Sequence, residues 1–300
     1  MQRTGARRDQ AEAAYAEANE DLEQATQILE NWRKNMANYT AADVKKLREE
    51  TDAPMMECKS ALEEANGDFA RAKEILREKG KAQAGKKAGR ATGAGVVAFS
   101  VADGTVAGVV LESETDFVSR NEGFAEIAQQ AADALRADAN TDLTAFATEA
   151  VSKFRENSQV GKTFRQEGAG VVSTYVHFDK TKGAVVLGEG DAEALRQVAI
   201  HAVAFPPQVV SKDQLSQTLL DSEFAVQKQR ALNEGKPENI AENIARGRVN
   251  KEFIKEAVLL EQPFYKEPGK SVQQWLAEDG KGAKITAFAY LAVGQGASAE

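Results

Sequence analysis

The chain has few of the residues on which most catalytic and metal sites depend. Its 300 residues include one cysteine, Cys58, and two histidines, His177 and His201. One thiol cannot form an intramolecular disulfide, and a lone thiol is typical of a reducing compartment. A Cys/His zinc cluster is excluded, and a Ser-His-Asp site would have few candidates for its base.

Long apolar runs and an excess of positive charge are also missing. No stretch approaches the ~20 apolar residues that a membrane helix needs, and the N-terminus lacks the apolar centre of a secretory signal. We therefore expect a cytoplasmic protein that binds no membrane. The net charge of −8 argues against direct nucleic-acid binding, because phosphate groups attract positive charge.

Sequence motifs for catalysis or nucleotide binding are absent too. The chain has no glycine-rich phosphate loop with Lys-Ser/Thr and no dinucleotide fingerprint. Its acidic residues are scattered and form no paired-carboxylate site or metal-ligand cluster. His177 falls in a predicted strand and His201 on a predicted helix, where histidines more often pack than catalyse. These observations predict a binding protein without cofactor, metal or covalent chemistry.

The N-terminal third divides into three segments. Residues 1–35 have two interpretations, a helical extension or sequence upstream of a true start at Met36, and the sequence does not choose between them. Residues 36–80 predict a three-helix domain, because apolar residues recur at helical spacing between breaks such as Asn66-Gly67. Residues 81–95, rich in Gly, Ala and Lys, predict a flexible basic linker.

Two related α+β units are predicted to follow. In the first, residues 96–165, strands surround the hairpin signal Asp103-Gly104 and lead into an amphipathic helix. The second, residues 166–300, repeats the hairpin-then-helix pattern. It also contains two polar helical segments, about 212–254, separated by Glu234-Gly235-Lys236-Pro237. These segments have too few apolar residues for a deep core, so they predict a projecting antiparallel helical hairpin.

One strand-to-helix junction has two interpretations. Residues 111–121 leave a predicted strand and enter a helix, with Phe117 at the junction. In the simpler interpretation Thr115 or Asp116 caps the helix and Phe117 packs inward. In the alternative, Phe117 is exposed and inserts into a pocket of a partner, with Asp116 presenting charge beside it.

From Met36 onward the chain resembles the elongation factor Ts family over nearly its whole length. The tetrapeptide Thr115-Asp116-Phe117-Val118 is the most telling segment. The other matching segments occur in family order, at residues 44–48, 55–62, 65–68, 86–90, 235–237, 240–242 and 262–264. Each match is weak alone, and together they are highly specific.

The resemblance implies an α+β fold with a small ubiquitin-associated-like N-terminal domain and a function in translation elongation. It implies a guanine nucleotide exchange factor, without covalent chemistry, whose partner is the GTPase elongation factor Tu. In this family the phenylalanine of the tetrapeptide wedges into the Mg²⁺ side of the GTPase domain. Carried over, Phe117 is the wedge, and Thr115, Asp116 and Val118 belong to the same exchange contact.

The resemblance also implies docking contacts elsewhere on the chain. Leu47, Met55 and Met56 match positions that dock on the GTPase domain of Tu, and His177 matches a position that packs on its far domain. The helical hairpin resembles an element that reaches the GTPase domain from another side. Whether the chain forms a homodimer or a 2:2 complex with Tu stays open.

One segment departs from the family pattern, and three other functions compete with exchange. The family commonly has Gly-Glu-Asn-Ile followed by two arginines, whereas this chain has residues 154–158 and a lone Arg165. The main alternative function is a generic protein-interaction module without exchange activity. The others are an enzyme that uses His177 or His201, and an RNA-binding factor that uses the basic linker.

Overall fold

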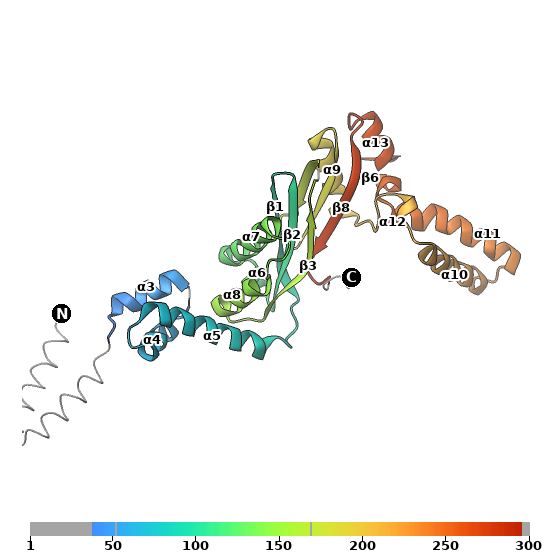
Figure 1. The fold of residues 1–300 in the computed structure, drawn as a ribbon. Coiled ribbons are helices and arrows are strands. Elements are labelled where there is room, and N and C mark those ends of the chain that lie inside the picture. Colours follow the sequence, from blue (N-terminus) through green and yellow to red (C-terminus); the bar gives the residue numbers. More distant parts are fainter. Residues whose placement is uncertain (1–37, 52, 169, 296–300) are drawn as a thin grey trace, which may run out of the picture. The chain divides into compact units, whose positions relative to one another are not determined.

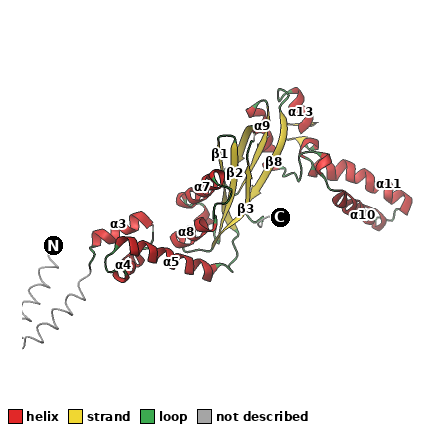
Figure 2. Cartoon of the chain, viewed as in Figure 1, coloured by secondary structure: helices red, strands yellow, loops and turns green. Residues whose placement is uncertain are grey.

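The computed structural model describes residues 38–51, 53–168 and 170–295 (Figure 1). The chain divides into two compact units, with the boundary after Lys81. Residues 1–35 and Met36, for which the sequence left two interpretations, lie outside the described residues. The predicted α+β class is confirmed, because helices accompany antiparallel sheets (Figure 2).

Among its described residues, the first unit contains α3 (Ala41–Thr51), α4 (Met55–Glu64) and the greater part of α5 (Phe69–Lys87). A capping box starts α3, where Thr40 N donates to Asp43 Oδ2 at 2.7 Å and Asp43 N donates to Thr40 Oγ1 at 3.2 Å. Gly67, at φ +86°, ends α4 by donating its N–H to Leu62 O. The apolar faces of the three helices form one small core, which includes the Cys58 thiol.

The linker prediction needs a correction at its N-terminal end. Residues 81–87 continue α5 as a helix, and only residues 88–93 connect it to the first strand. Lys, Ala and Gln are good helix formers, and one internal glycine, Gly85, lowers helix stability without ending the helix. The described connection is therefore shorter than the sequence indicated.

The second unit contains two three-stranded antiparallel sheets among its described residues. The first has the order β1-β2-β3 (Ala94–Ala102, Thr105–Ser113, Ser158–Gln166), and the second has the order β4-β5-β8 (Val171–Val176, Lys182–Glu189, Lys284–Ala292). Their inner faces pack on each other through a shared apolar cluster that includes Val106, Val185 and Leu187. A Cβ at Gly108 would lie 2.6 Å from Leu291, so glycine permits this close approach of the sheets.

Helices cover the outer faces of both sheets. In the first half, α7 (Glu122–Ala137) and α8 (Thr144–Phe154) follow the one-turn helix α6 (Asp116–Ser119) (Figure 1). Helix α7 packs on β1 and β2, whereas α8 packs on β3 and on α7. In the second half, α9 (Ala192–Ala204) packs on β4 and β5, and α13 (Val272–Glu278) contributes to the same apolar cluster. Because β2 and β5 are covered on both faces, they are apolar along most of their length rather than alternating.

The helical hairpin has a thin interior. It consists of α10 (Gln217–Asn233) and α11 (Glu238–Arg248), which lie side by side and project from the sheets in Figure 1. Buried alanines line the contact, and Lys228 pairs with Glu242 at 2.9 Å across it. The other elements in the described part of the second unit are η1 (Lys212–Gln214), the π-helix η2 (Val249–Phe253), α12 (Ile254–Ala257), η3 (Leu259–Glu261), β6 (Pro263–Phe264) and β7 (Glu267–Ser271).

Candidate partner-binding site

Phe117 stands on α6 with its side chain in solvent. Its relative exposure is 86%, whereas the next residue, Val118, is buried and packs into the core under the first sheet. Of the two interpretations of the junction, inward packing of Phe117 is therefore wrong. The short helix directs one apolar side chain inward and the adjacent aromatic ring outward.

The backbone before Phe117 is held by a carboxylate from a distant loop. Thr115 N donates to Glu156 Oε2 at 2.9 Å, and Thr115 Oγ1 donates to Glu156 Oε1 at 2.7 Å. Thr115 occupies the N-cap position of α6, but its side chain makes no capping bond. Asp116 instead pairs with the exposed Arg120 at 2.9 Å. A two-point contact with an ionised acceptor is among the stronger hydrogen-bond arrangements, so Glu156 defines where α6 begins.

A second carboxylate makes the reciprocal contact. Asn157 N donates to Glu114 Oε1 at 2.6 Å, and Asn157 Nδ2 donates to Arg90 O at 2.6 Å. Arg90 lies 3.3 Å from the Glu114 carboxylate. The Asn157 N–H, and after it the charge of Arg90, hold the pKa of Glu114 below its ordinary value. The carboxylate that makes this contact is therefore the ionised form. Residues 113–116 and 155–157 thus hold each other in place.

Arg155 lies in the segment, residues 154–158, that departs from the family pattern, and its backbone conformation is unusual. Its φ is +63°, a left-handed conformation that glycine adopts readily. The family pattern stated above has glycine before Glu-Asn, and Arg155 takes at this position a conformation that glycine favours. Lys87 Nζ donates to the Arg155 carbonyl, and Arg155 Nη1 donates to Gln83. Glu156 and Asn157 were missed as site residues, although the family's Glu-Asn pair was the signal that could have found them.

The docking residues in the first unit differ in exposure. Met55 and Met56 lie in the first turn of α4, with exposures of 43% and 72%. Leu47 is fully buried and packs in the three-helix core with Cys58. Its side chain therefore stabilises the unit and is not available to a partner, which corrects the docking role implied for Leu47.

His177 lies directly after β4, in the turn that leads to β5. Its Nδ1 is 3.2 Å from Asp179 Oδ1, and its ring is 4.5 Å from that of Phe178. Burial works to raise the pKa of Asp179, but the hydrogen bonds from Thr181, together with the adjacent His177 ring, outweigh it and hold the pKa below its ordinary value. His177 and Phe117 belong to the second unit, whereas Met55 and Met56 belong to the first.

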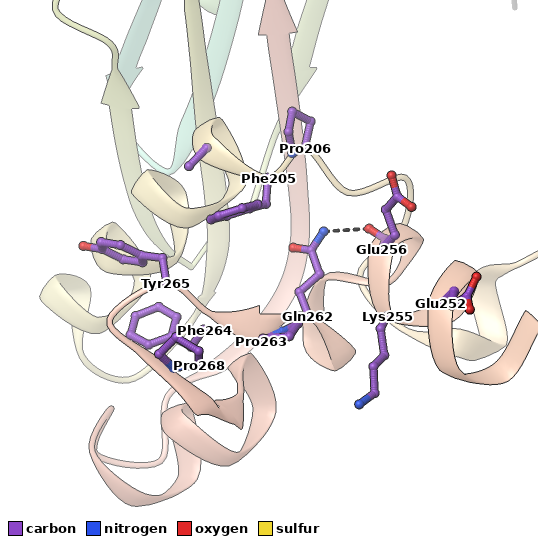
Figure 3. A pocket seen from close by; sticks show the side chains of 11 residues that line it. Phe205, Pro206, Glu252, Lys255, Glu256, Gln262, Pro263, Phe264, Tyr265 and Pro268 are labelled. Atoms are coloured by element: carbon purple, nitrogen blue, oxygen red, sulfur yellow. Dashed lines mark hydrogen bonds between the residues drawn. The ribbon is translucent and has the colours of Figure 1, made fainter. Parts of the chain in front are cut away.

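The other histidine supports the structure beside a separate pocket. His201 is buried, its Nδ1 accepts from Tyr265 N at 3.3 Å, and its Nε2 lies 2.8 Å from Gln262 Oε1. Burial lowers the pKa of His201 and favours the neutral ring. Gln262 in turn donates to Glu256 O at 2.7 Å (Figure 3). Gln262 and several aromatic and proline side chains line the pocket of about 500 Å³ shown there.

Metal clusters and membrane spans were sought among the described residues. No group of three or more His, Cys, Asp or Glu side chains in those ranges could hold a metal ion. Within the same ranges, no helix combines the length and apolar character that crossing a bilayer requires.

Known proteins resemble the chain over most of its length. A family model described as elongation factor TS matches residues 114–295. Elongation factor Ts of Azoarcus sp. strain BH72 is 41% identical over 278 residues, which cover 87% of this chain and 92% of that protein. The Haemophilus ducreyi protein of the same name is 39% identical, with coverage of 87% and 93%. The Vibrio parahaemolyticus protein is 41% identical, also with coverage of 87% and 93%.

These matches and the fold place the chain among the translation elongation factors. Within that class, the chain belongs to the elongation factor Ts family. The family predicted from the sequence segments is confirmed.

Proposed function

We propose that the chain is a guanine nucleotide exchange factor that binds elongation factor Tu·GDP and promotes release of GDP, so that GTP can bind. The observation that carries this proposal is the position of Phe117. The ring is exposed on a short helix whose start is held by Glu156. A ring presented in this way loses little conformational entropy when it enters a partner's pocket.

The proposed mechanism is displacement rather than covalent chemistry. Phe117 enters the Mg²⁺ side of the GTPase domain, and Thr115, Asp116 and Val118 complete the contact around it. Mg²⁺ requires near-ideal octahedral geometry, so a small shift of the residues around it weakens its binding. Losing the ion uncovers repulsion at the phosphates, and a shift of the phosphate loop removes backbone donors from the nucleotide.

Exchange of this kind also needs a broad contact surface. If the factor weakens GDP binding, GDP must weaken factor binding by the same free energy. One aromatic hot spot contributes about 2–4 kcal/mol on truncation, so other contacts must stabilise the nucleotide-free complex. We assign this docking to Met55 and Met56, to His177, and to the hairpin of α10 and α11. In this proposal the chain acts in the cytoplasm and needs no cofactor of its own.

The domain assignment follows from these roles. The three-helix domain, residues 36–80, docks on the GTPase domain. The first α+β unit, residues 96–165, carries the exchange contact, and the second, residues 166–300, carries His177 and the hairpin.

The proposal is tested by stopped-flow release of a fluorescent GDP analogue from elongation factor Tu. We expect strong acceleration by the wild-type chain and a large loss of that acceleration in Phe117→Ala. If a folded wild-type chain binds a cognate Tu without accelerating release, the chain is an interaction module without exchange activity. Light scattering of the mixture distinguishes a 1:1 complex from a 2:2 complex.

A further inference from the structure

The last turns of α5 contact the loop that holds the exchange junction. Lys87 Nζ donates to the Arg155 carbonyl, and Arg155 Nη1 donates to Gln83 Oε1. All three residues belong to the second unit, which begins at Ala82. The segment 81–95, which the sequence predicted to be a flexible linker, therefore includes residues whose partners lie 68 and 72 positions away along the chain.

The chain just after α5 also contacts this junction. Arg90 O accepts from Asn157 Nδ2 at 2.6 Å, and Arg90 Nη1 donates to Glu114 Oε1 at 3.3 Å. Asn157 follows the loop residue Glu156, whereas Glu114 precedes the tetrapeptide. The end of α5 and the residue Arg90 thus contact both of the segments that hold each other beside Phe117.

Arg155 adopts a backbone conformation that needs support. Its φ of +63° places an L residue in the left-handed region, where residues other than glycine are uncommon. Its N–H ends α8 by donating to Val151 O at 3.0 Å, and its carbonyl accepts from Lys87. That carbonyl belongs to the peptide group that leads into Glu156. Lys87 therefore helps to set the direction in which the chain enters Glu156.

We propose that Lys87 and Gln83 are positioning residues for the exchange contact, and that they act on Phe117. This inference rests on the proposed function. Lys87 holds the peptide group that leads into Glu156, and Glu156 accepts both hydrogen bonds from Thr115. Functional side chains have to be held within about 0.5 Å of their productive position by the residues that support them. Loosening the end of α5 therefore slows the release step more than it weakens docking, which other parts of the chain carry.

A neighbouring lysine separates this role from a general effect of charge. Any lysine in the last turn of a helix stabilises the helix by its interaction with the helix dipole. Lys86 and Lys87 both lie in the last turn of α5, but Lys86 is exposed and Lys87 is half-buried. Lys86→Met removes the same charge as Lys87→Met and leaves the bond to the Arg155 carbonyl in place. It is the matched control.

The test combines amide hydrogen exchange in the free chain with stopped-flow GDP release from elongation factor Tu. We expect Lys87→Met to speed exchange of the Thr115 amide about threefold or more, because the bond of that amide to Glu156 opens more often. The maximal release rate falls about fivefold. The Kd for nucleotide-free Tu stays within about twofold of wild type.

Three further variants sharpen the test. Gln83→Leu removes the acceptor for Arg155 and should change both quantities in the same direction as Lys87→Met. Lys87→Arg keeps a donor and should restore part of the release rate. Lys86→Met should leave the amide exchange and the release rate as in wild type.

A double variant shows whether Lys87 acts through Glu156. If it does, adding Lys87→Met to Glu156→Gln lowers the release rate by no more than about a further twofold, because changes within one chain of contacts are not additive. Fully additive losses would mean that Lys87 reaches the release step by another route, and the inference would be wrong.

The measurement in the free chain distinguishes failure of this inference from failure of the proposed function. If the wild type accelerates release but Lys87→Met leaves exchange of the Thr115 amide unchanged, or Lys86→Met slows release equally, the positioning role is wrong and the proposed function stands. If the wild type does not accelerate release while Lys87→Met still speeds exchange at Thr115, the proposed function is wrong and only the support of the junction stands.

Discussion

The two halves of the second unit join strand to helix in different ways. In the second half, β5 ends at Glu189 and α9 begins at Ala192, so two residues make the junction. In the first half, β2 ends at Ser113 and α7 begins at Glu122, so eight residues make the corresponding junction. Both helices then cover the outer face of their own sheet. Since two residues suffice for this connection, most of the longer junction is not needed to form the fold.

The hydrogen bonds at the two junctions also differ, because one junction is held by a neighbouring residue and the other by a distant one. At the short junction Asp191 caps α9, with its Oδ1 accepting from Ala194 N at 2.9 Å. At the long junction the bonds to Thr115 come from Glu156, which is 41 residues away in sequence. A local cap serves stability, whereas a loop supported from elsewhere can present a side chain. Functional residues are commonly found on such supported loops.

The largest expected effect comes from removing the exposed ring at the long junction. We expect Phe117→Ala to lower the maximal rate of GDP release about 30-fold or more, because truncation of an aromatic hot spot costs about 2–4 kcal/mol. The Tm stays within about 1 °C of wild type, since the ring is exposed and mutations at such sites change stability little. Stopped flow and thermal unfolding measure the two quantities. Equal losses of binding and maximal rate would argue against a specialised wedge.

A smaller loss is expected from weakening the support of that junction. Glu156→Gln replaces one of the two acceptor oxygens and removes the charge that strengthens both bonds to Thr115. We expect the maximal release rate to fall about tenfold, with less change in Kd. Glu189→Gln, at an exposed carboxylate beside the short junction, is the matched control. If both variants release GDP at the wild-type rate, the Glu156 contact does not position Phe117.

The buried His201 in the second half should make the free energy of unfolding depend on pH. Burial lowers the pKa of His201 below its ordinary 6.5, so the unfolded chain binds more protons than the folded chain below that pH. The stabilising contribution of the neutral ring is complete above pH 6.5 and is lost as pH falls from 6.5 toward the folded pKa.

Denaturant unfolding at several pH values between 7.5 and 5.5 measures this decline. The matched variant His201→Gln lacks the titrating ring and should show a flatter profile over the same range. Equal slopes for wild type and variant would mean that another group titrates in this window.

The smallest effect is expected at the short junction. Asp191→Ala removes the cap of α9 and the contact of Asp191 Oδ2 with Lys281 at 2.6 Å. We expect the Tm to fall by about 2–4 °C and the maximal rate of GDP release to stay unchanged. Together with Phe117→Ala, this variant tests whether one junction serves stability and the other serves exchange. A large loss of release rate in Asp191→Ala would remove that distinction.

Local signals in the sequence predicted much of the fold. The Asp103-Gly104 pair forms the predicted hairpin turn, with φ values of +51° and +71°. The break before Pro237 separates α10 from α11, as the stop-and-restart pattern indicated. Helical spacing of apolar residues located α7, whose inward positions include Phe124 and Ile127. The weakest boundary was at residues 81–87, where a lysine-rich stretch continues the helix.

The candidate site was only partly predictable. The tetrapeptide with Phe117 was found from its resemblance to a family, but composition alone favoured burial of the ring. Leu47 and Met56 both lie in apolar helical patterns, yet one is fully buried and the other is 72% exposed. Glu156 was not found, because the contact with Thr115 joins segments that are distant along the chain.

The sequence by itself determined the order of helices, strands and turns, since turn residues, caps and apolar spacing act over a few neighbouring positions. It also determined the family, through short segments that occur in the family's order. The tertiary structure decided that the two sheets pack face to face, that Phe117 points outward, and that Glu156 holds the backbone beside it. These features depend on which distant segments meet, because burial and long-range hydrogen bonds are set by neighbours in space.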